Sequence, residues 1–117
     1  MYINKDEEET IIKKADIPIF RVSKSITGQK VEGEKGAMTF VEIKKGGVSP
    51  YHNHESEQFN YVVKGKYKMR VEDREHIIYP GDIILIPSFI DHNMKALEDS
   101  VHIEFFSPPL SQEPPSE

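Results

Sequence analysis

The chain has 117 residues, which is enough for one domain with a hydrophobic core but too few for two. Its formal net charge of −5 and pI near 5.5 argue against a nucleic-acid partner, and the sequence has no basic cluster. The absence of cysteine excludes disulfides and thiolate metal sites, and no apolar run approaches the roughly 18 residues of a membrane span. The sequence therefore predicts a soluble, cytoplasmic protein without nucleic-acid or membrane partners.

The first third of the chain is predicted to contain an arm, an edge strand and a loop before its first regular strand. Residues 1–14 form a charged N-terminal arm, either solvated or donated to a neighbouring subunit. Residues 17–22 are predicted as an edge strand, because Pro18 cannot donate to a central ladder. Residues 28–36 are predicted as a polar loop, and residues 37–43 alternate as a strand.

Two strands are predicted to flank Gly65 as a hairpin, over residues 58–63 and 66–71. The second alternates cleanly between apolar and charged residues. The first does not, because its alternate residues from Phe59 to Val63 make a second apolar face. That face requires a cover, which a second sheet or a second subunit would supply.

The last third of the chain is also predicted to consist of strands. Residues 83–86 are apolar on both faces and are therefore predicted as a buried strand. A loop over residues 87–91 delivers His92, and residues 92–97 and 101–106 are predicted as a final hairpin.

Short strands with tight turns and no helical periodicity predict an all-β sandwich or barrel of the jelly-roll type. The domain is expected over residues 15–108, between the arm and a flexible tail at residues 109–117 that is rich in proline, serine and glutamate.

A divalent metal site is predicted around His52 and His54. On an extended strand alternate side chains share a face, so these two imidazoles point the same way. Gln58 lies at an even offset and can rejoin that face, and His92 is the candidate for a ligand from elsewhere in the chain. The alternative is a polar barrel mouth that holds no metal.

The predicted last strand carries His102 and Glu104 on one face, opposite alternate apolar residues. In a functional interpretation they are an acid and a base near the metal. In the alternative they are ordinary polar residues on a solvated face.

These residues resemble the two sequence motifs of the cupins, the double-stranded β-helix family. The first motif falls on Gly46, His52, His54, Gln58 and Gly65. The second falls on Gly81, Pro87 and His92, with Phe89 in place of a glycine and Ala96 in place of an asparagine. The resemblance implies a jelly-roll barrel that forms a homodimer.

Within the cupins, the C-terminal segment resembles small metal-dependent pectin-degradation proteins that open unsaturated uronate rings. Those proteins carry three histidines and a glutamine at the metal, an aspartate and a phenylalanine on the last strand, and an arginine just after it. The last three positions are Glu104, Phe106 and Leu110 here, so the acid is kept in kind and the arginine is lost.

The function expected from these features is binding of zinc, nickel, iron or manganese and action on a small oxygen-rich molecule, such as a sugar acid or keto acid. Glu104 or His102 would move a proton in a ring opening or isomerisation. A non-catalytic cupin that binds or senses a small ligand or metal, and a metal-dependent dioxygenase, remain as alternatives.

Overall fold

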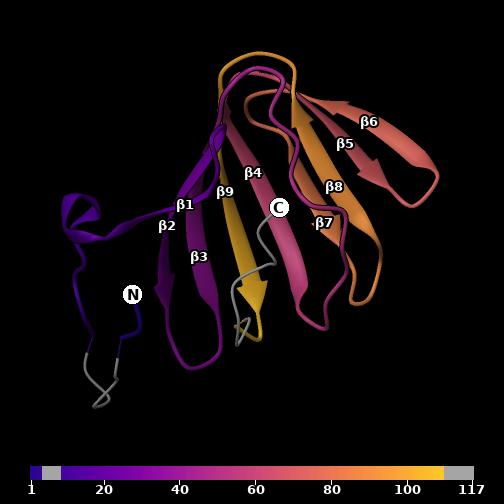
Figure 1. Ribbon diagram of the computed structural model, residues 1–117. Helices are drawn as coiled ribbons and strands as arrows, with labels where there is room; N and C mark the ends of the chain where they lie inside the picture. The colour runs from indigo at the N-terminus through magenta and orange to yellow at the C-terminus, as the bar shows by residue number, and fades with distance from the viewer. Residues whose placement is uncertain (4–8, 110–117) are drawn as a thin grey trace.

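The computed structural model describes residues 1–3 and 9–109, and over this part the chain folds into two facing antiparallel sheets (Figure 1). The larger sheet has the strand order β1-β2-β3-β9-β4-β7 and the smaller the order β6-β5-β8. The elements are η1 (Lys14–Asp16), β1 (Ile19–Ser23), β2 (Ile26–Glu32), β3 (Ala37–Ile43), β4 (Glu57–Lys64), β5 (Tyr67–Val71), β6 (Arg74–Ile78), β7 (Ile83–Ile86), β8 (His92–Ala96) and β9 (Ser100–Ser107). The predicted all-β jelly roll is confirmed.

The core lies between the two sheets and follows from the alternation of apolar residues along the strands. In β3 and β5 every second residue is buried, as the sequence predicts. Both sheets contribute to the core, through side chains such as Val41 and Val62 from the larger sheet and Tyr67, Met69 and Met94 from the smaller. The predicted edge strand is also confirmed, since β1 ends the larger sheet.

The two predicted hairpins are wrong, because the turns carry the chain from one sheet to the other. β4 pairs with β7 and β9, whereas β5 pairs with β6 and β8. β8 and β9 are separated in the same way. At the first crossing Gly65 has a φ of +90° and packs so closely on Ser100 that a Cβ would lie 2.1 Å from its Oγ.

The predicted loop at residues 28–36 is mostly a strand. β2 pairs with β3 over its full length and with β1 on its other side. Gly28, Gln29 and Lys30 have low strand propensity, but pairing on both sides overrides it. At Gly28 a Cβ would lie 2.6 Å from the Phe20 ring, so a larger residue there would require that ring to move.

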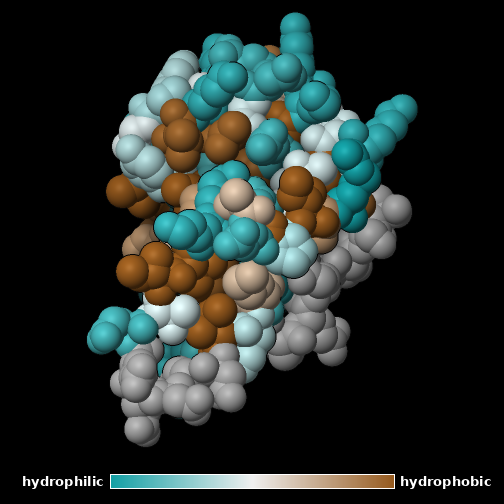
Figure 2. All heavy atoms as spheres, turned by 90° about the vertical axis from the view of Figure 1, so that its left-hand side faces the viewer, coloured by the Kyte–Doolittle hydropathy of each residue, from teal (hydrophilic) through white to brown (hydrophobic). Residues whose placement is uncertain are grey.

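The predicted buried strand at residues 83–86 is instead an edge strand, β7, with Ile83 65% exposed and Leu85 49% exposed. These residues belong to an apolar face on the side of the larger sheet away from the smaller one. We call it the outer face, and it includes Phe59, Tyr61, Ile83, Leu85, Ile103 and Phe105, which are cross-strand neighbours. Figure 2, a view from the side of β1 and β2, shows that hydrophobic side chains also gather on that side of the molecule.

The ends of the expected arm and tail lie partly outside the described residues. The N-terminal ammonium of Met1 donates a hydrogen bond to the Lys30 carbonyl at 2.6 Å, and Tyr2 bridges to Glu32. Residues 4–8 of the arm and residues 110–117 of the tail, which include Leu110, are outside the described part. Among the described residues no helix is long and apolar enough to cross a membrane.

Candidate metal centre

Three histidines from two separate segments meet at one end of the space between the sheets. One ring nitrogen of each lies within 4.8 Å of the others, and the ring centroids of His52 and His92 are 4.8 Å apart. His52 and His92 are joined by two backbone hydrogen bonds of 3.1 and 2.9 Å. The predicted histidine strand is therefore an extended segment with isolated bridges, but its geometry still directs His52 and His54 to the same place.

The backbone fixes which nitrogen of each ring faces the shared point. The Nδ1 atoms of His52, His54 and His92 each lie 2.8 Å from a backbone carbonyl oxygen, those of Pro50, Ser56 and Ile90 respectively. A carbonyl oxygen only accepts, so each Nδ1 carries the hydrogen and donates it. Each neutral ring is thereby left with a lone pair on Nε2, which is the arrangement of metal-binding histidines.

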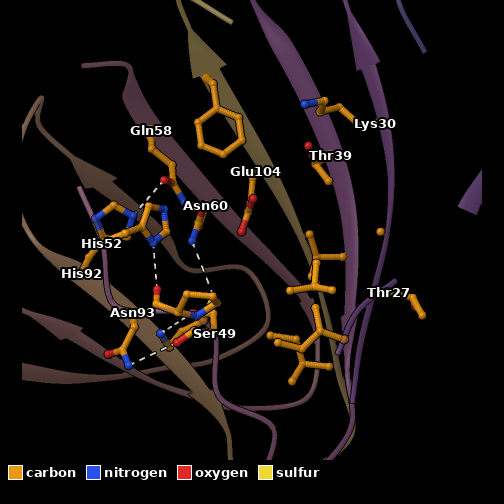
Figure 3. Close-up of a pocket in the computed structure, with 18 of the residues that line it drawn as sticks. Thr27, Lys30, Thr39, Ser49, His52, Gln58, Asn60, His92, Asn93 and Glu104 are labelled. Atoms are coloured by element: carbon orange, nitrogen blue, oxygen red, sulfur yellow. Dashed lines mark hydrogen bonds between the residues drawn. The ribbon is translucent and has the colours of Figure 1, made fainter. Parts of the chain in front are cut away.

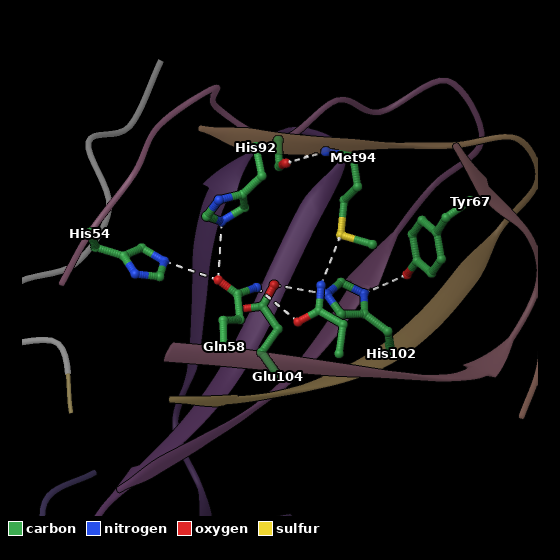
Figure 4. Close-up of polar contacts among 9 residues, drawn as sticks. His54, Gln58, Tyr67, His92, Met94, His102 and Glu104 are labelled. Carbon is green, nitrogen blue, oxygen red and sulfur yellow. Dashed lines mark hydrogen bonds and ion pairs between the residues drawn. The ribbon is translucent and has the colours of Figure 1, made fainter. Parts of the chain in front are cut away.

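Gln58 brings a fourth acceptor to the same point. Its Oε1 lies 3.0 Å from His54 Nε2 and 3.1 Å from His92 Nε2 (Figure 4). Because His54 and His92 carry their hydrogen on Nδ1, each Nε2 is an acceptor, as is Gln58 Oε1. Such close contacts between acceptors are favourable only when a cation lies between them. Three imidazole nitrogens and an amide oxygen suit a divalent first-row ion, so the residues fit the expected metal. Glu55 and Glu57, the neighbouring carboxylates, are exposed.

Burial lowers the pKa of His92, with the nearby His52 and His54 adding to the effect, while the Ile90 carbonyl and Glu104 oppose it. The lowered pKa keeps the His92 ring neutral near pH 7, in the state that a metal requires.

His102 and Glu104 face the interior, so a solvated face is excluded for this pair. His102 is fully buried, accepts from or donates to the Tyr67 hydroxyl at 2.7 Å through Nδ1, and lies 2.8 Å from Glu104 Oε2 through Nε2 (Figure 4). Burial, and then the charge of Glu104, raise the pKa of Tyr67 far above its usual value. The phenol therefore stays protonated and donates a hydrogen bond to Nδ1. The hydrogen of the His102 ring is then on Nε2, where it is donated to the carboxylate.

Glu104 lines a cavity that is also lined by His52, Gln58 and His92 (Figure 3). Across the inner face of the larger sheet, Lys30, Thr39, Glu104 and Asn60 are successive cross-strand neighbours. Lys30 is buried, and its Nζ lies 3.4 Å from Glu32 Oε1. Lys30 was not predicted because its segment was assigned to a loop, and Asn60 was not predicted although its even offset from Gln58 was a usable signal.

The second motif departs from the cupin pattern at Phe89, where the backbone has a φ of +62°. This left-handed conformation is the one that glycine adopts without strain, which explains the glycine of the pattern. The Phe89 N–H donates to the His54 carbonyl at 2.7 Å, so the loop before His92 is held against the first histidine segment.

Comparison with known proteins agrees with this architecture. Residues 39–107 match the cupin domain model. No curated protein matches the chain. Among solved structures, an RmlC-like cupin from Shewanella frigidimarina is similar with a TM-score of 0.82 at 21% identity, covering 89% of this chain and 95% of that one.

Two further structures extend the comparison. KdgF from Halomonas sp. gives a TM-score of 0.80 at 28% identity, covering 86% of this chain and 96% of that one. A mutant of Bacillus subtilis oxalate decarboxylase OxdC gives 0.77 at 21% identity over 90% of this chain but only 32% of the longer enzyme. The fold, the spaced histidine motifs and the match to the family model together show that this chain belongs to the cupin family.

Proposed function

We propose that this cupin binds a divalent metal through His52, His54, Gln58 and His92 and acts on a small oxygen-rich acid by proton transfer. The observation that carries the proposal is the convergence of four acceptors on one point of a cavity that also exposes a carboxylate. A divalent ion bound there would polarise a carbonyl or hydroxyl oxygen of the ligand. Ring opening or isomerisation of a sugar acid or keto acid is the reaction class that fits.

Glu104 is the residue proposed to move the proton. His102 donates to its Oε2 at 2.8 Å, which orients the carboxylate and leaves the second oxygen to a ligand. His102 itself is fully buried behind Glu104, so it acts as a positioning residue. Glu104 and Phe106 also stand where the uronate-ring-opening cupins carry their acid and aromatic residues, and the structural similarity to KdgF supports that comparison.

An acidic ligand is favoured by the charges of the cavity wall. Of the described residues lining the cavity, Lys30 is the only lysine or arginine and Glu104 the only carboxylate. A divalent ion added to this pair makes the cavity net positive, because all four metal-binding groups are neutral. Because Lys30 is paired with Glu32, the ion itself would supply the positive charge that meets a ligand carboxylate, in a chain that has Leu110 in place of the arginine.

The experiment begins with the metal content of the purified protein after loading with first-row ions. The variant His52→Ala should lose the metal, whereas His76→Ala, which changes an exposed histidine outside the site, should retain it. Equal metal content in the two variants, or none in the wild type, would refute the metal site.

The metal-loaded protein is then screened with sugar acids and keto acids by thermal shift and by turnover. A ligand at about 100 times its Kd should add about 2.7 kcal/mol of stability. Glu104→Gln should keep the thermal shift and lose turnover. A ligand that binds without being converted would favour the binding or sensing module, and consumption of oxygen would favour a dioxygenase.

We also propose that the outer face forms a homodimer interface. Tyr61 is 44% exposed at its centre, with apolar neighbours on β7 and β9. Such a contiguous apolar face needs a cover, and a second copy of the same sheet presents a face of the same kind. Light scattering should give twice the mass of the chain for the wild type and the mass of one chain for Tyr61→Glu. A monomeric wild type would refute the dimer.

A further inference from the structure

We infer that Asn60 is a positioning residue that commits Gln58 to the metal as a neutral amide and so sets the charge of the metal site. This inference depends on the proposed metal site. Gln58 and Asn60 lie two residues apart on β4, and both point inward with exposures of 3% and 0%. Neither side chain can turn to solvent, so each must satisfy its polar groups inside the protein.

The Gln58 amide is oriented by its nitrogen end. Its Nε2 donates to Asn60 Oδ1 at 2.8 Å, in a buried contact. A side-chain amide has its donor and its acceptor at opposite ends of one planar group. Because Asn60 engages the donor, the oxygen is turned to His54 and His92, at 3.0 and 3.1 Å. Figures 3 and 4 show this direction, with Gln58 between the histidines and the interior.

The orientation of Asn60 is in turn favoured by Met94. Asn60 Nδ2 lies 3.8 Å from the Met94 sulfur, which is a weak acceptor and offers no hydrogen. If Asn60 turned its amide over, its oxygen would face that sulfur without a donor. The orientation in which Nδ2 donates to the sulfur and Oδ1 accepts from Gln58 therefore gives both ends of the Asn60 amide a partner, and the flipped orientation does not.

This arrangement discriminates between glutamine and glutamate at position 58. A glutamate would place a carboxylate oxygen against Asn60 Oδ1, so two acceptors would meet in a buried site. It would also add a second negative charge near Glu104, which is the cross-strand neighbour of Asn60 on β9. Asn60 thus favours the neutral ligand, and the ion keeps its full charge for the acidic ligand of the proposed function.

The test compares Asn60→Leu with Asn60→Asp, using Co²⁺ as the probe. Asn60→Leu is similar in size and removes the acceptor, whereas Asn60→Asp keeps an oxygen in the position of Oδ1 but adds a charge beside Glu104 and removes the donor to the Met94 sulfur. Co²⁺ affinity is measured by competition with a chelator, and the coordination is followed by the absorption spectrum of bound Co²⁺. Circular dichroism of the metal-free proteins reports folding.

Asn60→Leu should bind Co²⁺ about 10–100-fold more weakly than the wild type with an altered spectrum, as expected for loss of a group that orients a ligand. Asn60→Asp, in which an oxygen still engages the Gln58 nitrogen, should keep the spectrum and bind Co²⁺ at least as tightly as the wild type, because its added charge attracts the cation. Should Asn60→Leu fail to fold, Asn60→Thr, whose hydroxyl is too short to reach Gln58 in the same way, carries the same expectation.

The inference is overturned if the folded Leu or Thr variant binds Co²⁺ as tightly as the wild type with an unchanged spectrum, or if Asn60→Asp loses as much affinity as Asn60→Leu. A wild type that fails to bind Co²⁺ would instead refute the metal site itself. The two failures are therefore distinguishable in one set of titrations.

Discussion

Replacing Tyr67 by phenylalanine isolates one buried hydrogen bond beside the candidate site. The substitution keeps the aromatic ring, whose centroid lies 4.9 Å from that of His102 in an edge contact, and removes only the hydroxyl that donates at 2.7 Å. Both residues are fully buried, so no solvent replaces the lost donor. His102 Nδ1 is then left as an unsatisfied buried acceptor.

The expected loss follows from the energy of such a group. An unsatisfied buried acceptor costs about 1–3 kcal/mol. For a chain of 117 residues, the average unfolding entropy amounts to ~0.25 kcal/mol per degree. Tyr67→Phe should therefore lower the Tm by about 4–12 °C at neutral pH, measured by circular dichroism at a fixed metal state.

Tyr79→Phe is the matched control, because it removes the hydroxyl of an exposed tyrosine outside the outer face and should change stability by less than about 0.5 kcal/mol. Nitrogen NMR of labelled histidine gives a second readout. His102 should have its hydrogen on Nε2 in the wild type, and the Nδ1 signal should move in Tyr67→Phe. Equal Tm shifts for the two tyrosine variants, or a wild-type His102 with its hydrogen on Nδ1, would show that the proposed bond direction is wrong.

Gly65→Ala should destabilise more than Gly46→Ala by about 1–3 kcal/mol in chemical denaturation, because both have positive φ but only Gly65 would press a Cβ on Ser100; equal losses would count against the close approach. Phe89→Gly should raise the Tm by about 2–4 °C, because relief of the left-handed strain outweighs the extra backbone entropy of glycine; a fall would mean that the exposed Phe89 side chain contributes packing. The lowered pKa of His92 means that the unfolded chain binds more protons below about pH 6.5, so the stability of the metal-free protein should fall as the pH drops through that window. Tm scans with chelator should show this decline, and it should weaken in His92→Gln; an unchanged decline in that variant would assign it to other groups.

The fold could be predicted where one strand's own residues decide the outcome. The strand at residues 37–43 alternates strictly, and the structure assigns the same bounds to β3. Partner choice could not be predicted, because a glycine turn at Gly65 reverses the chain equally well within a sheet or between sheets. The close packing of Gly65 on Ser100, which lies 35 positions further along the chain, favours the turn between sheets. β2 was missed for a related reason, since its pairing with two neighbours outweighs the weak strand propensity of its residues.

The convergence of the candidate metal residues could be predicted because their spacing and motifs carry it. His52 and His54 share a direction through local geometry, and His92, the candidate from elsewhere in the chain, also falls on the second motif of the resemblance. Tyr67 was not assigned to the site, because it lies in the smaller sheet and meets His102 only across the core. Alternation tells which face of a strand a residue occupies, but it does not tell which residue lies opposite in another sheet.

The charges of the site also follow from contacts that cross between strands. The chain as a whole is acidic, with a formal charge of −5, so its overall field would repel an acidic ligand. Inside the cavity the charges are balanced, because the described lining has one lysine, one carboxylate and otherwise neutral groups around the histidines. Glutamine rather than glutamate at position 58 preserves that balance, so a bound ion would keep its full charge. Under the proposed function, attraction of an acid would therefore come from the ion held beside this balanced lining, whereas composition alone gives the opposite expectation.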